Sequence, residues 1–261
     1  MFNFLYIIIS SEYIYLERIF GGIVMKLIIL NKKALITIIA TLLLLIILSV
    51  IYFYPAKTKE TFNQDIYYQG NKDEKLIAFA CNIDWGEEYI PQMLKIFEEN
   101  GIKITFFPTG RWAKNNNDII KNIFDKGHEI GNHGYHHLDY DKLSYDENRE
   151  EISKAHELLK NIIGKDPVYF APPSGAYNKN TVNAAMDLNY KIIMWSIDTI
   201  DWREDSTKDV IVGRIKKNLH NSAIVLMHPT QETVKALPEI INYLFQKGYK
   251  IGTISDVIEN N

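Results

Sequence analysis

The chain has 261 residues, a formal net charge of −3 and a single cysteine, Cys81. That length allows one domain of roughly 200 residues with appendages. The near-neutral charge argues against a nucleic-acid-binding surface, which needs a basic excess, and the lone cysteine excludes an intrachain disulfide.

The first distinctive segment is the apolar run 34–54, which carries no charged side chain. It is long enough to cross a bilayer core, which takes about 20 helical residues. Lysines precede it in segment 1–33, so the positive-inside rule predicts a cytoplasmic N-terminus and a single-pass membrane protein. No small-x-small cleavage pattern follows, so we expect an uncleaved transmembrane anchor, with secretion after signal-peptide cleavage as the alternative. Met25 is a second possible start, which would leave residues 1–24 unexpressed.

Residues 55–73 are polar and charged, which is typical of a linker. The remainder, 74–261, alternates short apolar runs with amphipathic stretches. The predicted strands are 76–83, 103–107, 128–131, 168–170, 191–197, 223–227 and 250–254. The predicted helices are 90–99, 117–126, 145–163, 181–188, 207–219 and 232–246. This alternation favours a parallel α/β architecture, either a barrel or an open doubly wound sheet.

Polar residues follow five of these strands directly. In chain order, they are Asp84, then His133 and His137, then the loop 171–175, then Asp198 and Asp201, and then His228. The carboxyl ends of barrel strands form the rim where active sites are built. A His-x-x-x-His pair on a helical turn places both rings on one face, within reach of one ion. The pattern therefore predicts one metal-containing site.

These motifs, in this order, resemble the NodB-type polysaccharide deacetylases, carbohydrate esterase family 4, over residues 76–258. The matching stretches are Asn82-Ile83-Asp84-Trp85-Gly86, His133 to His137, Ala171-Pro172-Pro173-Ser174-Gly175, Asp198-Thr199-Ile200-Asp201-Trp202 and Leu226-Met227-His228. The resemblance implies a distorted (β/α) barrel of about seven strands. Together with the predicted anchor, these motifs resemble a branch of the family that is associated with sporulation.

The resemblance also implies roles for individual residues. His133 and His137 would bind a divalent metal ion, zinc by expectation and cobalt or manganese as alternatives, with Asp84 as a third ligand. Asp84 and His228 would act as general base and general acid. The substrate-binding residues would be Pro172, Pro173, Ser174, Gly175, Asp198 and Trp202.

The sequence departs from the family pattern at two of these positions. Trp85 replaces the second, metal-binding aspartate, and Ala171 replaces an arginine that orients the base. Three interpretations stay open. Asp84 is a metal ligand and the base comes from elsewhere, for instance Glu87 or Glu88. Alternatively, Asp84 is the base and the ion rests on two histidines and water. In the third, the protein binds glycan without cleaving it.

The leading hypothesis is an extracytoplasmic, metal-dependent polysaccharide deacetylase. It would hydrolyse the N-acetyl amide bonds of a cell-wall glycan such as peptidoglycan. The rival is a degenerate, non-catalytic glycan-binding or structural protein of the cell wall or spore envelope.

Overall fold

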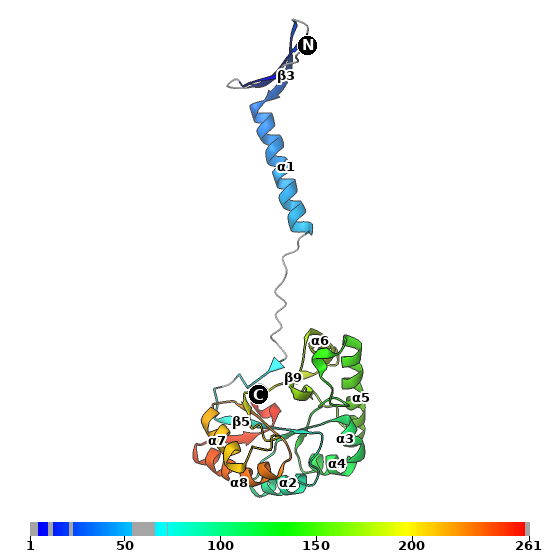
Figure 1. Ribbon diagram of the computed structural model, residues 1–261, viewed down its shortest axis with the longest axis vertical. Coiled ribbons are helices and arrows are strands. Elements are labelled where there is room, and N and C mark those ends of the chain that lie inside the picture. Colours follow the sequence, from blue (N-terminus) through cyan, green and yellow to red (C-terminus); the bar gives the residue numbers. More distant parts are fainter. Residues whose placement is uncertain (1–4, 10–12, 21–22, 54–65, 72, 259–261) are drawn as a thin grey trace. The chain divides into compact units, whose positions relative to one another are not determined.

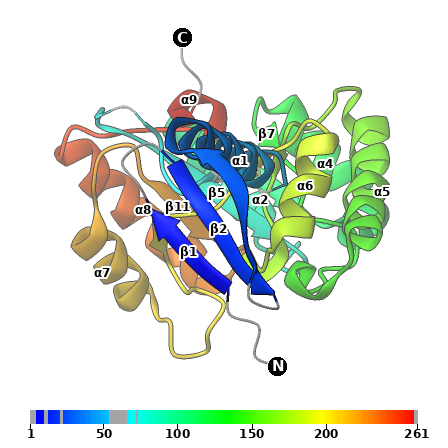
Figure 2. The ribbon, with the colours of Figure 1, turned by 90° about the horizontal axis from the view of Figure 1, so that it is seen from above.

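The computed structural model describes residues 5–9, 13–20, 23–53, 66–71 and 73–258. The chain divides into two compact units, Met1–Phe62 and Asn63–Asn261 (Figure 1). In the first unit, β1 (Leu5–Ile9), β2 (Tyr13–Phe20) and β3 (Ile23–Asn31) form an antiparallel sheet in the order β1-β2-β3 (Figure 2). These strands were not predicted from the sequence.

Helix α1 (Lys32–Phe53) covers the apolar run expected to be the membrane anchor. Of the helices in the described part of the chain, none combines the length and apolar character that a membrane crossing requires. The anchor at 34–54 and the single-pass topology stay predictions.

The second unit contains two parallel sheets. One has the order β10-β11-β5-β6-β7, with β12 also paired to β5, and the other has the order β4-β9-β8. The strands of the first sheet are β5 (Leu76–Ile83), β6 (Thr105–Pro108), β7 (Glu129–Ile130), β10 (Ile197–Asp198), β11 (Ile224–Met227) and β12 (Lys250–Gly252). The strands of the second are β4 (Ile66–Tyr67), β8 (Tyr169–Phe170) and β9 (Lys191–Ile193).

Single β-bridges connect the two sheets, where the family resemblance implied one distorted barrel. Asn132 bridges to Phe170, and Gln69 bridges to Ala223. The predicted strand 191–197 is divided into β9 and β10, because the Met194 amide donates to Tyr67 in one sheet and the Ser196 amide to Ile224 in the other. Two amides that are two residues apart thus bond to different sheets.

The linker predicted at 55–73 extends too far toward the C-terminus. Strand β4 lies inside it and pairs in parallel with β9, so this part of the chain belongs to the sheet. Residues 54–65 and 72 of that prediction lie outside the described residues.

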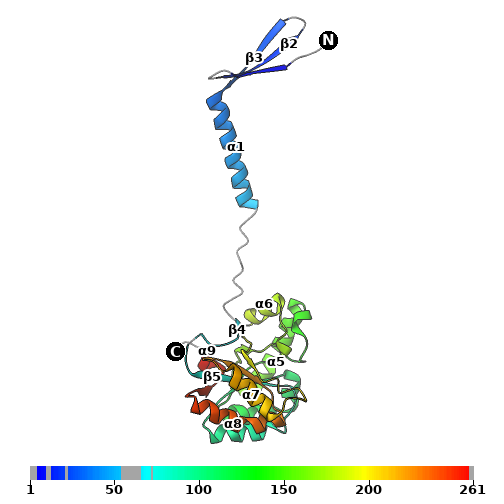
Figure 3. The same ribbon diagram turned by 60° about the vertical axis from the view of Figure 1, so that its left-hand side comes forward.

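The six predicted helices are confirmed around these sheets (Figure 3). They are α2 (Ile90–Glu99), α4 (Asn117–Asp125), α5 (Tyr145–Ile163), α6 (Lys179–Asp187), α7 (Lys208–Asn218) and α8 (Gln231–Gln246). Two short helices were not predicted, α3 (Gly110–Asn115) and α9 (Ile254–Ile258). Helix α5 begins at a reciprocal capping box in which Ser144 and Glu147 bond each other's backbone amides.

Strand β5 lies between two parts of the hydrophobic core, and a polar side chain stands at its carboxyl end. Phe79 and Cys81 pack in one hydrophobic cluster, while Ala78 and Ala80 pack in another. Successive side chains of a strand point to opposite faces, so Asn82 shares the face of the two alanines and stands at the carboxyl end of β5. Burial raises the pKa of the Cys81 thiol well above its ordinary value, which makes it an inert core residue.

His128 makes folding stability sensitive to mildly acidic pH. Its buried Nδ1 accepts a hydrogen bond from the Ile104 amide at 3.1 Å, so the ring must be neutral. Burial, helped by the charge of Lys103, lowers the pKa of His128 to about 4. Between that value and the ordinary 6.5 the unfolded chain binds a proton that the folded chain does not. Stability therefore falls as pH decreases through this window.

We expect this histidine to contribute a loss of about 1.4 kcal/mol per pH unit inside the window. The test is urea unfolding at several pH values for the native chain and for His128→Asn, whose amide oxygen can still accept the Ile104 amide. The variant should lose that part of the pH slope. An unchanged slope would show that His128 titrates normally in the folded protein.

Candidate functional site

A cavity of about 390 Å³ lies where β5, β10 and β11 end. It is lined by Asn82, Asp84, Trp85, His133, His137, Ser174, Trp195, Asp198, Trp202, Leu226 and His228. The structure thus brings most of the predicted site residues to one place. Three residues of the predicted substrate-binding loop, Pro172, Pro173 and Gly175, are not among the residues that line the cavity.

Asp84 is held at both carboxylate oxygens. Its Oδ1 accepts hydrogen bonds from the Thr109 hydroxyl and the Arg111 Nε, each at 2.7 Å, and its Oδ2 forms an ion pair with the same guanidinium group. Burial alone would raise the pKa of Asp84, but the bonds from Arg111 and Thr109 outweigh it and hold the pKa below its usual value. Asp84 is therefore an ionised carboxylate that already has its partners.

The ion pair of Asp84 with Arg111 was not predicted from the sequence. Arg111 lies in α3, a helix too short for its periodicity to be recognised, and it has no counterpart among the motifs that carried the resemblance. The indication available was Thr109, whose hydroxyl both caps α3 and donates to Asp84.

His133 and His137 approach each other through a loop and not on the helical turn that was expected. Their ring centroids are 5.1 Å apart. The loop needs a left-handed backbone at Gly134 (φ +71°), where a Cβ would lie 2.0 Å from the Tyr140 hydroxyl, and again at His137 (φ +58°).

The His133 ring is buried and neutral. Its Nδ1 lies 2.7 Å from the carbonyl oxygen of Ala171. Since a carbonyl only accepts, Nδ1 carries the hydrogen and Nε2 keeps its lone pair. Burial, with the neighbouring His137, lowers the pKa of His133 to about 3.

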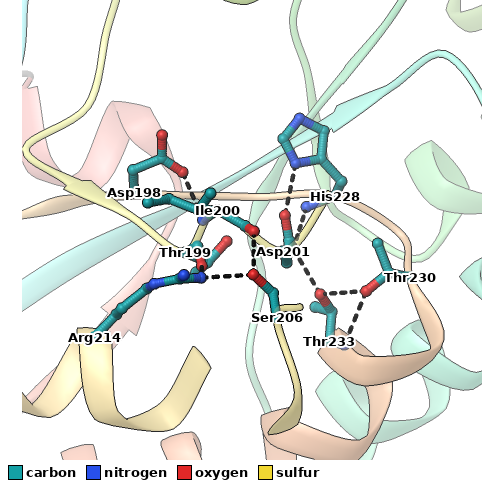
Figure 4. Close-up of polar contacts among 9 residues, drawn as sticks. All are labelled: Asp198, Thr199, Ile200, Asp201, Ser206, Arg214, His228, Thr230 and Thr233. Carbon is teal, nitrogen blue, oxygen red and sulfur yellow. Dashed lines mark hydrogen bonds and ion pairs between the residues drawn. The ribbon is translucent and has the colours of Figure 1, made fainter. Parts of the chain in front are cut away.

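His228 is oriented by a buried carboxylate (Figure 4). Its backbone amide and its Nδ1 both bond Asp201, each at 2.7 Å, and the Thr233 hydroxyl donates to the same carboxylate at 2.6 Å. The sequence predicts Asp201 only as one of two carboxylates that follow a strand. Its place in the stretch Asp198 to Trp202, which carries the family resemblance, was the available indication of this role.

The Arg214 side chain of α7 holds the loop that carries Asp198 and Asp201. The Arg214 guanidinium donates to the Thr199 carbonyl at 2.5 Å and to the Ser206 hydroxyl at 2.8 Å, and Ser206 donates to the Ile200 carbonyl (Figure 4). Asp198 accepts the Ile200 amide at 2.7 Å. The loop is thereby rigid enough to position residues on the cavity wall.

Comparisons with known proteins identify the family. The family model described as polysaccharide deacetylase matches residues 69–193. A peptidoglycan-N-acetylglucosamine deacetylase of Bacillus cereus is 33% identical, covering 73% of this chain and 70% of the relative. The Bacillus subtilis protein YlxY is 38% identical over 78% of this chain, which spans 64% of YlxY. The chain belongs to the polysaccharide deacetylase family.

Solved structures include both enzymes and an inactive relative. BA3943 of Bacillus anthracis, described as a pseudoenzyme of carbohydrate esterase family 4, is 38% identical, with a TM-score of 0.72 over 74% of this chain and 69% of BA3943. A BA3943 mutant with restored enzymatic activity is 37% identical at the same TM-score, over 74% of this chain and 71% of the mutant. The Bacillus subtilis deacetylase PdaA is 29% identical, with a TM-score of 0.69 over 81% of this chain and 88% of PdaA.

In this family member, the side chains present do not fit the metal site expected from His133, His137 and Asp84. Within the described ranges, no group of three or more histidine, cysteine, aspartate or glutamate side chains is arranged to hold a metal ion. Two imidazoles are available, but both oxygens of Asp84 are bonded to Arg111 and Thr109. A catalytic zinc ion takes three protein ligands and one open position.

The position of the missing carboxylate is taken by an aromatic ring. Trp85 stacks on His228, with ring centroids 6.1 Å apart and planes 9° from parallel. Trp85 is 43% exposed and Trp202 is 57% exposed, although both line the cavity. In this chain, the part of the cavity where the family pattern places a metal-binding carboxylate is therefore a partly exposed aromatic surface.

The side chains at positions 87, 88 and 171 do not replace the base or the arginine of the family pattern. Glu87 accepts a hydrogen bond from the Trp112 indole at 3.1 Å, and neither Glu87 nor Glu88 lines the cavity. Ala171 is buried, and its carbonyl oxygen accepts a hydrogen bond from His133. Arg111 instead holds Asp84, from a different element than the family arginine.

Proposed function

We propose that this chain binds a cell-wall glycan such as peptidoglycan in the cavity without hydrolysing its N-acetyl groups. The observation that carries the proposal is the lack of a free carboxylate for a metal ion. Trp85 stacks on His228 where the family pattern has an aspartate, and both oxygens of Asp84 are bonded to Arg111 and Thr109. Without a third ligand, an ion bound to His133 and His137 would be weakly held.

The cavity supports glycan binding through its aromatic and polar walls. Sugar rings have apolar C–H faces that pack on exposed aromatic rings, and Trp85 and Trp202 present such surfaces. Sugar hydroxyls need polar partners, and Asp198 and His228 lie on the same cavity wall. Asp201 fixes the direction of the His228 ring before any ligand arrives.

Metal-dependent deacetylation is the second candidate, favoured by one observation. Asp84 is ionised and the His228 ring is held by Asp201, so the base and acid positions implied by the family are both filled. A weakly bound zinc, cobalt or manganese ion would supply the Lewis acidity for attack on the acetamide.

One experiment separates the two candidates. The full chain is incubated with N-acetylglucosamine oligomers and with peptidoglycan, with Zn²⁺, Co²⁺ or Mn²⁺ added or with EDTA. We expect binding in every condition and no acetate release in any. Acetate release that depends on added metal would establish the deacetylase instead.

Replacing the aromatic surface should weaken glycan binding. We expect Trp85→Ala and Trp202→Ala each to reduce affinity about tenfold, since truncating an aromatic anchor of a binding site costs more than about 1 kcal/mol. Calorimetric titration with the same oligomers measures this. Trp112→Phe, at a buried ring outside the cavity, is the matched control and should bind as the native chain does. Unchanged affinity in both cavity variants would contradict the proposed binding surface.

We further propose that the second unit works outside the cytoplasm, held to the cell membrane by residues 34–54. The support is the uncharged apolar run with lysines before it and the cell-wall location of the proposed ligand. A reporter fused after Asn261 that is active only outside the cytoplasm tests this orientation. Activity of a cytoplasm-specific reporter at that position would reverse it.

A further inference from the structure

The cavity wall is rich in hydrogen-bond acceptors. Asn82 is 4% exposed, lines the cavity, and its Oδ1 has no hydrogen-bond partner. His133 donates from Nδ1 to Ala171, which leaves the lone pair of Nε2 unused. A buried acceptor without a partner is costly, so Asn82 Oδ1 indicates a ligand that donates, and the lone pair of His133 Nε2 can accept from the same ligand.

Asp198 adds a negative charge to the same wall. One of its oxygens accepts the Ile200 amide, and among the ion pairs of the described residues none involves Asp198. Arg203 of this loop pairs with Asp205, and Arg214 of α7 bonds Thr199 and Ser206. Ala171 leaves no cation at the position of the family arginine.

An N-acetyl group matches this wall poorly. An acetamide offers one N–H donor, together with a carbonyl acceptor and a methyl group. A protonated amine offers three donors and a positive charge, which suits Asn82, His133 and Asp198 together. We infer that the cavity binds a hexosamine whose 2-amino group is free, in preference to its N-acetylated form. This inference rests on the proposed glycan-binding function and names the sugar class that the site takes.

The test compares a glucosamine hexamer with an N-acetylglucosamine hexamer. Calorimetric titration of the full chain is done at roughly pH 6, where the amines are protonated, with EDTA present so that no metal ion bridges ligand and protein. We expect the glucosamine hexamer to bind about tenfold more tightly, the scale of one charge-assisted hydrogen bond.

Asp198→Asn is the decisive variant. It keeps an oxygen for the Ile200 amide but removes the charge, so the preference for the glucosamine hexamer should fall to about twofold or less. Asp205→Asn, at an exposed carboxylate paired with Arg203, is the control and should keep the preference. Circular dichroism of each variant verifies folding.

The outcomes separate this inference from the function on which it rests. Equal or tighter binding of the N-acetylated hexamer would overturn the inference and leave glycan binding intact. A preference that survives Asp198→Asn would also overturn it, because the charge would then act elsewhere on the surface. Binding of neither hexamer would remove the proposed function as well.

Discussion

Replacing Trp85 by aspartate is expected to create a zinc site. Residue 85 lies on the cavity wall with His133 and His137, so a carboxylate there would join two imidazoles. That gives a catalytic zinc site its three protein ligands. After dialysis, Trp85→Asp should retain about one zinc ion per chain, and the native chain should retain far less. Mass spectrometry of the bound metal measures this.

The same variant should gain acetate release from N-acetylglucosamine oligomers, because Asp84 is already ionised beside Arg111 and His228 is already oriented by Asp201. Trp85→Asn is the matched control, since it has nearly the same size and lacks the charge. Trp85→Asp combined with His133→Ala should lose the zinc again. Full zinc occupancy in the native chain would contradict the view that residue 85 decides metal binding.

Periodicity was sufficient to predict the scaffold of the second unit. Strand β5 and helices α2 and α5 begin and end where their apolar patterns do, and α5 also has its capping box. The division of 191–197 could not be predicted, because it depends on which sheet the amides of Met194 and Ser196 reach. Strand β4, with two residues, has too few positions to show an alternating pattern.

The sequence predicted which residues form the candidate site better than it predicted the hydrogen bonds and ion pairs that they make. Strand-end positions identified Asp84, His133, His137 and His228 as neighbours, because parallel strands deliver their carboxyl ends to one edge. The partners of these residues escaped prediction. Arg111 comes from an unpredicted helix, and it takes the carboxylate that a metal ion would need. Local spacing carries no information on such long-range pairing.

Removing the Asp201 carboxylate is expected to be the most destabilising change at the site. Its side chain is fully buried and accepts three hydrogen bonds, from the backbone and ring of His228 and from Thr233. Asp201→Ala leaves these three donors without a partner in a place that water does not reach. Because each buried orphan costs roughly 1–3 kcal/mol, we expect a loss of about 3 kcal/mol or more in the free energy of unfolding.

Urea unfolding followed by tryptophan fluorescence measures this loss for the second unit alone, since all four tryptophans lie between residues 85 and 202. Asp205→Ala is the control: its ion pair with Arg203 is exposed on both sides, so the change should stay below about 1 kcal/mol. A similar small loss for Asp201→Ala would mean that His228 finds other partners. The ring would then be free to turn, and neither its stacking on Trp85 nor a fixed acid position could be attributed to Asp201.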